Sequence, residues 1–288
     1  SISGVFSFSE NAGNGDATKT PAQWLLELEK MSVKQELNTS QGQLIEWILR
    51  GSYPEIASNK KVDRKVWCAS YIATYLERDV RNITSIGDLN QFDRFLTLCA
   101  TRTGQMLNYS DMARDIGISV PTAKRWISIL EASYQVHLLY PYYKNIGKRL
   151  VKTPKLYFTD TALATYLLGI HDSVTLLGSP HFGSLFETAL VNEALKRFTH
   201  TGEKAPLYFL RTHTKEEVDI AIEYATKLSL FEIKASATIT PKHAESLTRF
   251  IGDLTRIPFS NAYLISQSPH RATLSSGIRL RHWGDLCE

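Results

Sequence analysis

The stretch "VDIAIEYATKLSLFEIKAS", residues 218–236, is an apolar run interrupted by Asp219, Glu232 and Lys234. Side chains alternate between the two faces of a strand, so Glu232 and Lys234 share one face. The short segment "YATKLS" inside the stretch is typical of a turn that joins two strands. A hairpin brings Asp219 near Glu232, and the stretch therefore predicts two antiparallel strands that carry two acids and a lysine.

Two interpretations of these three residues stay open at this point. Two carboxylates on adjacent strands can hold Mg²⁺ or Mn²⁺, because Mg²⁺ is bound by one or two acids together with waters and a phosphate oxygen. A lysine beside them can orient the attacking water or stabilise the charge that develops on phosphorus. The alternative is a sheet with one solvated face, on which lysine and glutamate simply pair across strands.

A third acid, Glu187, precedes the hairpin in "GSLFETALVNEALKRF", residues 183–198, which has the pattern of an amphipathic helix. Apolar residues flank it on one side, so Glu187 is expected to point toward the sheet. A carboxylate in that position is costly unless it is paired or bound to a metal. We expect Glu187 to complete the metal site, Glu193 to lie on the surface and His213 to be a loop residue.

Periodicity around the hairpin predicts a helix, three strands, a second helix and a last strand. The expected elements span residues 185–198, 207–210, 218–223 and 228–234, then a helix opened by Thr240-Pro241, then residues 262–266. This order indicates an α+β or mixed α/β fold.

The segment "NYSDMARDIGISVPTAKRWISILEASY", residues 108–134, has the cadence of a helix-turn-helix. It predicts a short helix capped by Ser110, a turn at Gly117 and a second helix capped by Ser119. The residues expected on the inner face of the second helix are Ala123, Ile127, Leu130 and Tyr134. A strand, a basic loop and another strand are expected in residues 135–160, and together these elements predict a winged helix.

The candidate nucleic-acid-binding residues come from the outer face of the second helix and from the basic loop. They are Thr122, Lys124, Arg125, Lys144, Lys148, Arg149 and Lys152. Lys155 adds a further base, and Glu131 is the only acid between residues 121 and 155. This surface is therefore expected to contact DNA phosphates. The alternative is a solvated basic loop on a domain that packs against protein.

The first part of the chain predicts helices after a loose start. Residues 1–20 are rich in Gly, Ser, Asn and Thr. Within them, "GNGDATKT" has Thr18 where a phosphate-binding P-loop needs glycine, so ATP binding is not expected there. Two helical stripes are expected to face inward. One stripe is Val62, Val66, Ala69, Ala73, Leu76 and Val80, and the other, after a cap at Asp88, is Phe92, Phe95, Leu96 and Cys99.

The composition is that of an ordinary soluble globular protein, with 288 residues, 43% hydrophobic and 22% charged, and a net charge of +4. No apolar run approaches the roughly 20 residues that span a bilayer. No cleavable signal opens the chain, so we expect a cytoplasmic protein without membrane contact. Cys68, Cys99 and Cys287 are odd in number and far apart, which favours buried free thiols. The first residue is Ser, as expected for a piece of a longer protein or after removal of an initiator Met.

The sequence resembles the PD-(D/E)XK nuclease motif at four positions, which are, in order, Glu187 on the predicted helix, Asp219, Glu232 and Lys234. Longer blocks resemble, in order, the C-terminal region of a widespread family of prokaryotic AAA-type ATPases; they include "GSYPEI", "TYLERDVRNI", "NIGKRLVKTPKLYFTDTALATYLLGI" and "EEVDIAIE". In that family, a C-terminal domain of unknown function carries a nuclease-like fold. The resemblance covers most of the chain after about residue 50. The ATPase core, with its Walker motifs, is absent from this sequence.

These patterns divide the chain into four expected parts. They are a flexible start (1–20), a helical segment (21–105), a winged-helix domain (106–170) and a PD-(D/E)XK nuclease-like α/β domain (171–288).

The resemblance implies that Glu187, Asp219, Glu232 and Lys234 are catalytic residues, and that the three acids bind Mg²⁺ or Mn²⁺. DNA is the expected partner, together with an AAA-type ATPase core on the same or a separate chain. The function expected is DNA binding with metal-dependent endonuclease activity. The alternative is a non-catalytic DNA-binding or regulatory module of an ATPase, in which the nuclease fold is a scaffold. The sequence does not indicate an oligomeric state.

Overall fold

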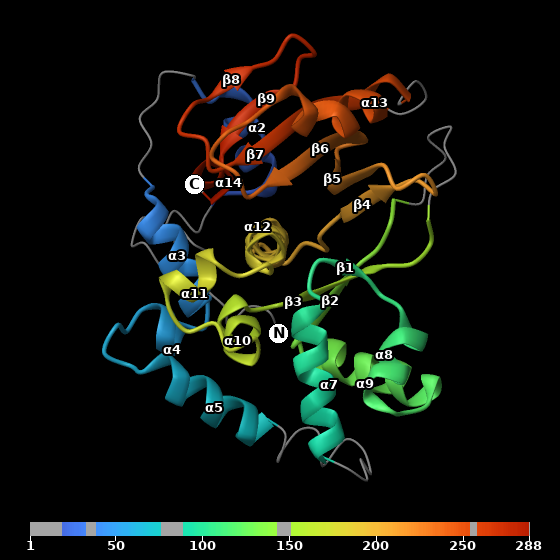
Figure 1. Ribbon diagram of the computed structural model, residues 1–288. Coiled ribbons are helices and arrows are strands. Elements are labelled where there is room, and N and C mark those ends of the chain that lie inside the picture. Colours follow the sequence, from blue (N-terminus) through green and yellow to red (C-terminus); the bar gives the residue numbers. More distant parts are fainter. Residues whose placement is uncertain (1–18, 33–38, 76–88, 143–150, 254–257, 288) are drawn as a thin grey trace. The chain divides into compact units, whose positions relative to one another are not determined.

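A computed structural model describes residues 19–32, 39–75, 89–142, 151–253 and 258–287. These residues form a mixed α+β fold, with helices in the N-terminal part and a mixed sheet in the C-terminal part (Figure 1). They fall into two compact units. The first unit contains Ile45–Leu138 and Pro154–Ala189, and the second contains Ser7–Leu44, Leu139–Thr153 and Leu190–Glu288. The predicted domain boundaries at residues 105 and 170 stay predictions. Of the expected flexible start, residues 1–18 lie outside the described residues.

The first unit combines helices with a small sheet. Its described helices are α4 (Pro54–Ala57), α5 (Arg64–Tyr75), α7 (Leu89–Thr101), α8 (Tyr109–Ile116), α9 (Val120–Ala132), α10 (Thr161–Leu167) and α11 (Ser173–Leu177). The helix α3 (Gln41–Arg50) belongs to this unit from residue 45 onward. The strands β1 (Gln105–Met106), β2 (Val136–Leu139) and β3 (Lys155–Phe158) form a three-stranded sheet in the order β1-β3-β2.

The inward stripe predicted for α7 is confirmed. Phe92, Phe95, Leu96 and Cys99 are buried, and Trp126 of α9 packs edge-on against both phenylalanine rings with centroids 5.2 Å apart. Aromatic rings favour this edge-to-face geometry. The cap expected at Asp88 lies outside the described residues. The core of this unit therefore fixes α9 against α7.

The inward stripe predicted for α5 is wrong. Val66 is 64% exposed, and the buried face of α5 carries Cys68, Ile72 and Tyr75. Arg64 lies on that buried face and donates hydrogen bonds to the carbonyl of Ile170 and the hydroxyl of Thr165, each at 2.9 Å. A buried guanidinium needs such acceptors, and they are found beside α10, so α5 turns this face inward. Leu76 and Val80 of the predicted stripe lie outside the described residues.

The second unit is built on a six-stranded mixed sheet. Its strands are β4 (Leu207–Arg211), β5 (Glu217–Tyr224), β6 (Lys227–Lys234), β7 (Phe259–Ser266), β8 (Ala272–Thr273) and β9 (Arg279–His282). The order is β4-β5-β6-β7-β9-β8, with β6, β7 and β9 parallel and the other neighbouring pairs antiparallel. The predicted succession of three strands, a helix and a strand is confirmed, and β8, β9 and α14 (Trp283–Cys287) are additional.

Helices cover both faces of this sheet. On one face, the turn η3 (Pro241–Ala244) and α13 (Glu245–Asp253) bury Leu247 and Phe250 in one cluster with Leu230 and Leu264. On the other face, Phe231 stacks on Trp24 of α2 (Pro21–Lys30). The edge of Trp24 in turn meets Phe198, in the part of α12 (Phe182–Thr199) that belongs to the second unit.

The helix α12 is not amphipathic as predicted, because its residues from Leu185 to Phe198 are buried with the exception of half-buried Glu187. A helix that is buried on all sides has no solvated stripe. Glu193 was expected on the surface and is fully buried, 3.4 Å from the guanidinium of Arg197 one turn later. The ion pair compensates for burial of the carboxylate.

The three cysteines and His213 lie as predicted. Cys68, Cys99 and Cys287 are free and buried, and burial raises the pKa of the Cys68 thiol to about 12. His213 is an exposed residue of the segment between β4 and β5. Within the described residues, every helix is too short or too polar to cross a membrane.

Candidate functional site

Asp219 lies beside the Glu232–Lys234 segment, as the hairpin predicted. The pairing of β5 with β6 extends to Ile220 and Phe231. Beyond that pair, Oδ2 of Asp219 accepts a hydrogen bond from the backbone N–H of Ile233 at 2.8 Å. The carboxylate thus takes a backbone donor of β6 between Glu232 and Lys234. We call Asp219, Glu232 and Lys234 the Asp219 cluster.

The acids of the Asp219 cluster are not on a solvated face. Asp219 is 6% exposed and Glu232 is 4% exposed, and Nζ of Lys234 lies 2.5 Å from Oε1 of Glu232. The lysine side chain is 33% exposed. Burial of a charged carboxylate requires such a partner. The interpretation as a wet sheet face is therefore wrong for the two acids, although lysine and glutamate do pair, along one strand rather than across two.

The donor set of the Asp219 cluster fits a divalent cation only in part. Within the described ranges, no group of three or more His, Cys, Asp or Glu side chains could hold a metal ion. Asp219 and Glu232 match the one or two carboxylates that Mg²⁺ uses when waters and phosphate oxygens complete its shell. The lysine ammonium already balances one of the two charges. A metal here would depend on oxygens from water and substrate.

Glu187 has different partners from those predicted. Its Oε1 accepts hydrogen bonds from Nζ of Lys155 at 2.9 Å and from the hydroxyl of Tyr157 at 2.5 Å. All three belong to the first unit, whereas the Asp219 cluster belongs to the second. Lys155 and Tyr157 are two residues apart on β3 and so share a face, which is the signal that could have indicated a common partner. A role of Glu187 in a metal site stays a prediction.

Lys155 was counted with the bases expected to face DNA, and this expectation is wrong. Its side chain is 2% exposed and its ammonium pairs with Glu187. A buried lysine that is already paired with a carboxylate cannot reach a phosphate in solution.

The α8–α9 turn, residues 117–119, is fixed by hydrogen bonds at both sides. The helix α8 is capped by Asn108, whose side chain accepts from the N–H groups of Ser110 and Asp111, so the cap predicted at Ser110 is wrong. Gly117 ends α8 with φ of 81°, a left-handed conformation that favours glycine. Ser119 caps α9 by accepting from the N–H of Thr122, as predicted.

The outer face of α9 carries the bases predicted for it. Lys124 and Arg125 are exposed and Thr122 is half-buried, while Ala123, Ile127 and Leu130 are buried on the inner face. Nζ of Lys124 lies 5.7 Å from the ring centroid of Tyr109, within the range of a cation–π contact. Tyr134 was expected on the inner face and is exposed, because α9 ends at Ala132 and Tyr134 has a φ of 58°.

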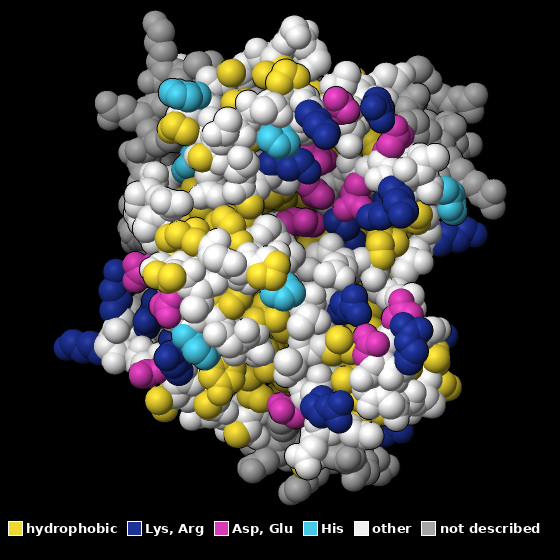
Figure 2. Space-filling model, viewed as in Figure 1, with side chains coloured by type: hydrophobic (Ala, Val, Ile, Leu, Met, Phe, Trp, Pro, Cys, Tyr) yellow, Lys and Arg dark blue, Asp and Glu magenta, His cyan; other side chains and the backbone are white. Residues whose placement is uncertain are grey.

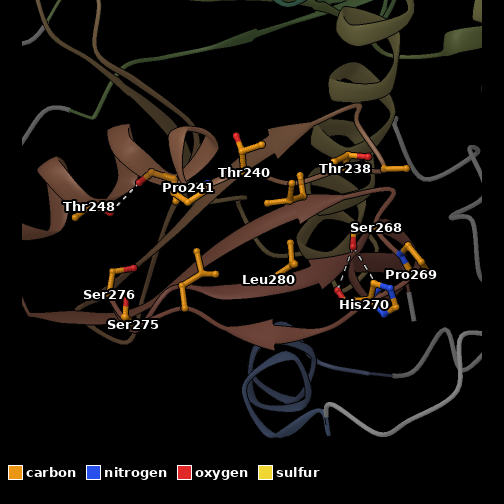
Figure 3. Close-up of a pocket in the computed structure, with 14 residues that line it drawn as sticks. Thr238, Thr240, Pro241, Thr248, Ser268, Pro269, His270, Ser275, Ser276 and Leu280 are labelled. Carbon is orange, nitrogen blue, oxygen red and sulfur yellow. Dashed lines mark hydrogen bonds between the residues drawn. The ribbon is translucent and has the colours of Figure 1, made fainter.

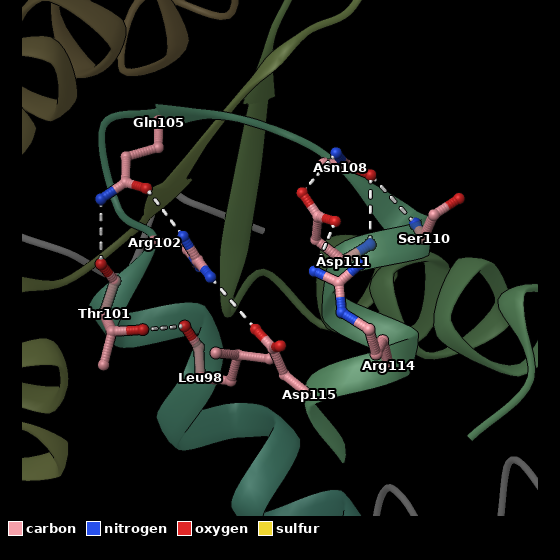
Figure 4. Close-up of polar contacts among 9 residues, drawn as sticks. All are labelled: Leu98, Thr101, Arg102, Gln105, Asn108, Ser110, Asp111, Arg114 and Asp115. Carbon is pink, nitrogen blue, oxygen red and sulfur yellow. Dashed lines mark hydrogen bonds and ion pairs between the residues drawn. The ribbon is translucent and has the colours of Figure 1, made fainter. Parts of the chain in front are cut away.

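Acids near the α8–α9 turn are neutralised by neighbouring bases. Asp115 pairs with Arg102 at 3.1 Å, and Asp111 pairs with Arg114 at 2.8 Å (Figure 4). These acids are therefore balanced locally. The charged residues of α9 are Lys124, Arg125 and Glu131.

The predicted basic loop is described only in part. Lys144, Lys148 and Arg149 lie outside the described residues, and Lys152 is exposed. On the face of the molecule shown in Figure 2, lysine and arginine side chains are interspersed with aspartate and glutamate. Phosphate contacts on that face would therefore come from individual bases rather than from a uniform basic field.

Comparison with known proteins gives two matches to families without known function. Residues 41–174 match a domain of unknown function (DUF8612), and residues 182–283 match another domain of unknown function (DUF4143). The second is a domain found C-terminal to AAA ATPase domains in many proteins.

Two mycobacterial relatives cover most of the chain. An uncharacterised protein of Mycobacterium bovis and one of Mycobacterium tuberculosis are each 29% identical to it over 254 residues, which is 88% of this chain. The aligned part is 55% of each relative, so the chain spans little more than half their length. No solved structure matches the chain.

Proposed function

We propose that the chain is a DNA-binding protein in which α9 is the recognition helix of a winged helix. The observation that carries this proposal is the pair Lys124 and Arg125, both exposed and five and six residues after the cap at Ser119. The succession of α8, α9, β2 and β3 supports the winged-helix interpretation. Charge reversal of the two bases, followed by a salt-dependent DNA-binding measurement, tests it.

The physical basis of this binding is release of counterions from the DNA phosphates. Lys124 is held over the Tyr109 ring and so loses little conformational freedom on binding. Arg125 offers planar N–H donors suited to phosphate oxygens. Because Trp126 is packed between Phe92 and Phe95, the helix presents both bases from a rigid position.

A second candidate function is hydrolysis of a phosphodiester at the Asp219 cluster. The observation that favours it is the contact of Asp219 with Ile233, which brings both acids and Lys234 to one place on the hairpin. Mg²⁺ or Mn²⁺, when bound, would supply a Lewis acid and an acidified water. Asp219 and Glu232 would hold it, and Lys234 would place positive charge beside a phosphate oxygen. Assay of DNA cleavage with substitutions in the cluster tests this candidate.

In the non-catalytic alternative, the second unit is a scaffold. It predicts DNA binding that depends on Lys124 and Arg125, without cleavage under any divalent cation. The similarity of residues 182–283 to a domain found C-terminal to AAA ATPase domains supports action together with such an ATPase in both cases. Co-purification of this chain with the part of a mycobacterial relative that lies outside the aligned 55% would test that partnership.

A further inference from the structure

A pocket of about 670 Å³ lies in the second unit, over the sheet face that carries α13 (Figure 3). Its walls are residues 237–241, which follow β6, residues 268–270, which follow β7, and residues 274–276, which precede β9. The volume is within the range of about 300–1,000 Å³ that is usual for small-molecule sites. In open α/β sheets, ligands bind beside segments that follow the carboxyl ends of parallel strands, and two such segments line this pocket.

The lining of the pocket is rich in hydroxyl groups and includes one imidazole, that of His270. None of the described residues that line it is Asp, Glu, Lys or Arg. The hydroxyl side chains are Thr238, Thr240, Thr248, Ser268, Ser275 and Ser276. Ala244 and Leu280 are buried and add an apolar floor. Figure 3 shows the side chains of Thr240, Ser268 and Leu280 coming from three separate segments. Such a lining suits the neutral, hydroxylated part of a ligand that also has an apolar surface.

The pocket and the Asp219 cluster share one face of the sheet. Glu232 lies opposite Leu264 of β7, and Leu264 lies opposite Leu280 of β9, which lines the pocket. Neighbouring strands are about 4.8 Å apart, so Glu232 and Leu280 are separated by roughly 10 Å. Lys234, two residues after Glu232, lies on the same face, and its side chain is 33% exposed. A partly exposed ammonium, paired with Glu232, therefore lies on the same sheet face as the pocket.

We propose that this pocket is a subsite for the sugar and base of a nucleotide whose phosphate lies at Lys234. A nucleotide joins an anionic group to a hydroxylated ring and a flat base, and the face presents a cation, hydroxyl groups and an apolar floor. The inference rests on the nucleic-acid substrate of the proposed function. It adds that the second unit recognises the sugar and base next to that phosphate.

Titration calorimetry of the full chain tests this subsite without any cleavage reaction. The probes are the four nucleoside 5′-monophosphates and the four matching nucleosides, measured without divalent cation. Wild type binds at least one pair, with the monophosphate tighter than its nucleoside. Lys234→Gln weakens the monophosphate about tenfold to a hundredfold, since it removes a hydrogen bond to a charged group. The same substitution leaves nucleoside affinity unchanged.

A blocking substitution separates the pocket from the rest of the sheet. Ser276→Trp places a large ring at an exposed position of the wall and abolishes binding of both ligands. Thr273→Trp, on β8 and outside the lining, is the matched control and retains binding. Thr248→Trp blocks the pocket from the helix side and has the same effect as Ser276→Trp. Thermal melting confirms that each variant is folded.

The outcomes distinguish this inference from the proposed function. DNA binding by wild type with no nucleotide or nucleoside binding overturns the subsite and leaves the function of α9 intact. Nucleotide binding that Ser276→Trp abolishes, in a protein that binds no DNA, supports the subsite and overturns the DNA-binding function. Equal affinity for nucleoside and monophosphate, insensitive to Lys234→Gln, overturns the assignment of the phosphate to Lys234.

Discussion

Nζ of Lys155 lies 2.9 Å from Oε1 of Glu187, which joins β3 to α12 within the first unit. The hydroxyl of Tyr157 donates to the same oxygen. The carboxylate of Glu187 is therefore held by two groups of one strand. This contact gives the acid a structural role, independent of any metal.

Lys155→Met is expected to lower the free energy of unfolding by about 3 kcal/mol, because it leaves the Glu187 carboxylate without its buried counterion. The double variant Lys155→Met with Glu187→Leu should recover part of that loss. Urea unfolding followed by circular dichroism measures both values. A loss below about 0.5 kcal/mol in Lys155→Met, which is usual for a surface substitution, would contradict the importance of the pair.

Asp219 is expected to show a difference between two substitutions. Asp219→Asn keeps an oxygen that can accept the hydrogen bond from the N–H of Ile233, so the stability should stay close to wild type. Asp219→Ala leaves this buried donor unsatisfied, and the free energy of unfolding should fall by about 1–3 kcal/mol. Unfolding curves of the two variants test this. Equal stability of both would argue against the observed contact.

Cleavage at the Asp219 cluster is expected to need the charges of Asp219 and Lys234 and not only a folded hairpin. With Mn²⁺ or Mg²⁺, wild type should nick plasmid DNA, and the stable variant Asp219→Asn should lose this activity. Lys234→Gln should lower the rate on the order of a hundredfold, as for loss of a donor to a developing charge. Glu203→Gln, at an exposed loop position, is the control and should cleave like wild type. Undiminished cleavage by Asp219→Asn would point to a contaminating nuclease.

The sequence predicted the parts of the fold that depend on local periodicity. The inner face of α9 followed from the spacing of Ala123, Ile127 and Leu130, and the hairpin followed from the alternation around Asp219. The α5 stripe failed because two faces of that helix carry apolar residues at helical spacing. The choice between them depends on Arg64 and its acceptors near α10, which are about a hundred residues away in the chain.

Long-range partners also limited prediction of the site. The pairing of Lys155 with Glu187 spans 32 residues, and no local pattern specifies it. The strand β9 was missed because "RLRH" is basic and short, yet Arg281 is buried and donates to the carbonyl of Leu28. The residues of the Asp219 cluster were predicted from alternation and turn length, whereas their burial depends on the helices that cover the sheet.

The stability of the second unit should fall in acid because of His282. Burial lowers the pKa of this imidazole to about 4, with Asp285 opposing the shift and Arg271 adding to it. Its Nδ1 accepts a hydrogen bond from the N–H of Gly284, which requires the unprotonated nitrogen. The unfolded chain binds this proton near pH 6.5. Stability from this group is therefore complete above about pH 6.5 and is lost progressively as the pH falls toward 4.

His282→Asn should reduce this acid dependence, because an amide oxygen can accept from Gly284 without titrating. Chemical unfolding at pH 7, 6, 5 and 4.5 measures the slope. Burial also lowers the pKa of His137 to about 4 in the first unit, so a residual slope is expected in this variant. An unchanged slope in His282→Asn would show that His282 does not titrate on unfolding.

DNA binding is expected to depend on two bases of α9. In Lys124→Glu with Arg125→Glu, the slope of log affinity against log salt should fall by about 2, because each base releases about one counterion. Fluorescence anisotropy with a labelled duplex at several salt concentrations measures this slope. The inner face of α9 is unchanged, so the fold should be retained.

The matched control is Lys204→Glu, an exposed charge reversal in the second unit that alters net charge without touching α9. A general electrostatic effect would lower affinity in both variants in proportion to the charge changed. Specific phosphate contacts lower the salt slope only in the α9 variant. If the α9 variant binds with wild-type affinity and slope, the two bases do not contact DNA, and the exposed face of α9 must instead be a surface for protein. One salt titration series distinguishes DNA contact by α9 from a protein-binding role, because the slope of log affinity against log salt reports the number of phosphate contacts.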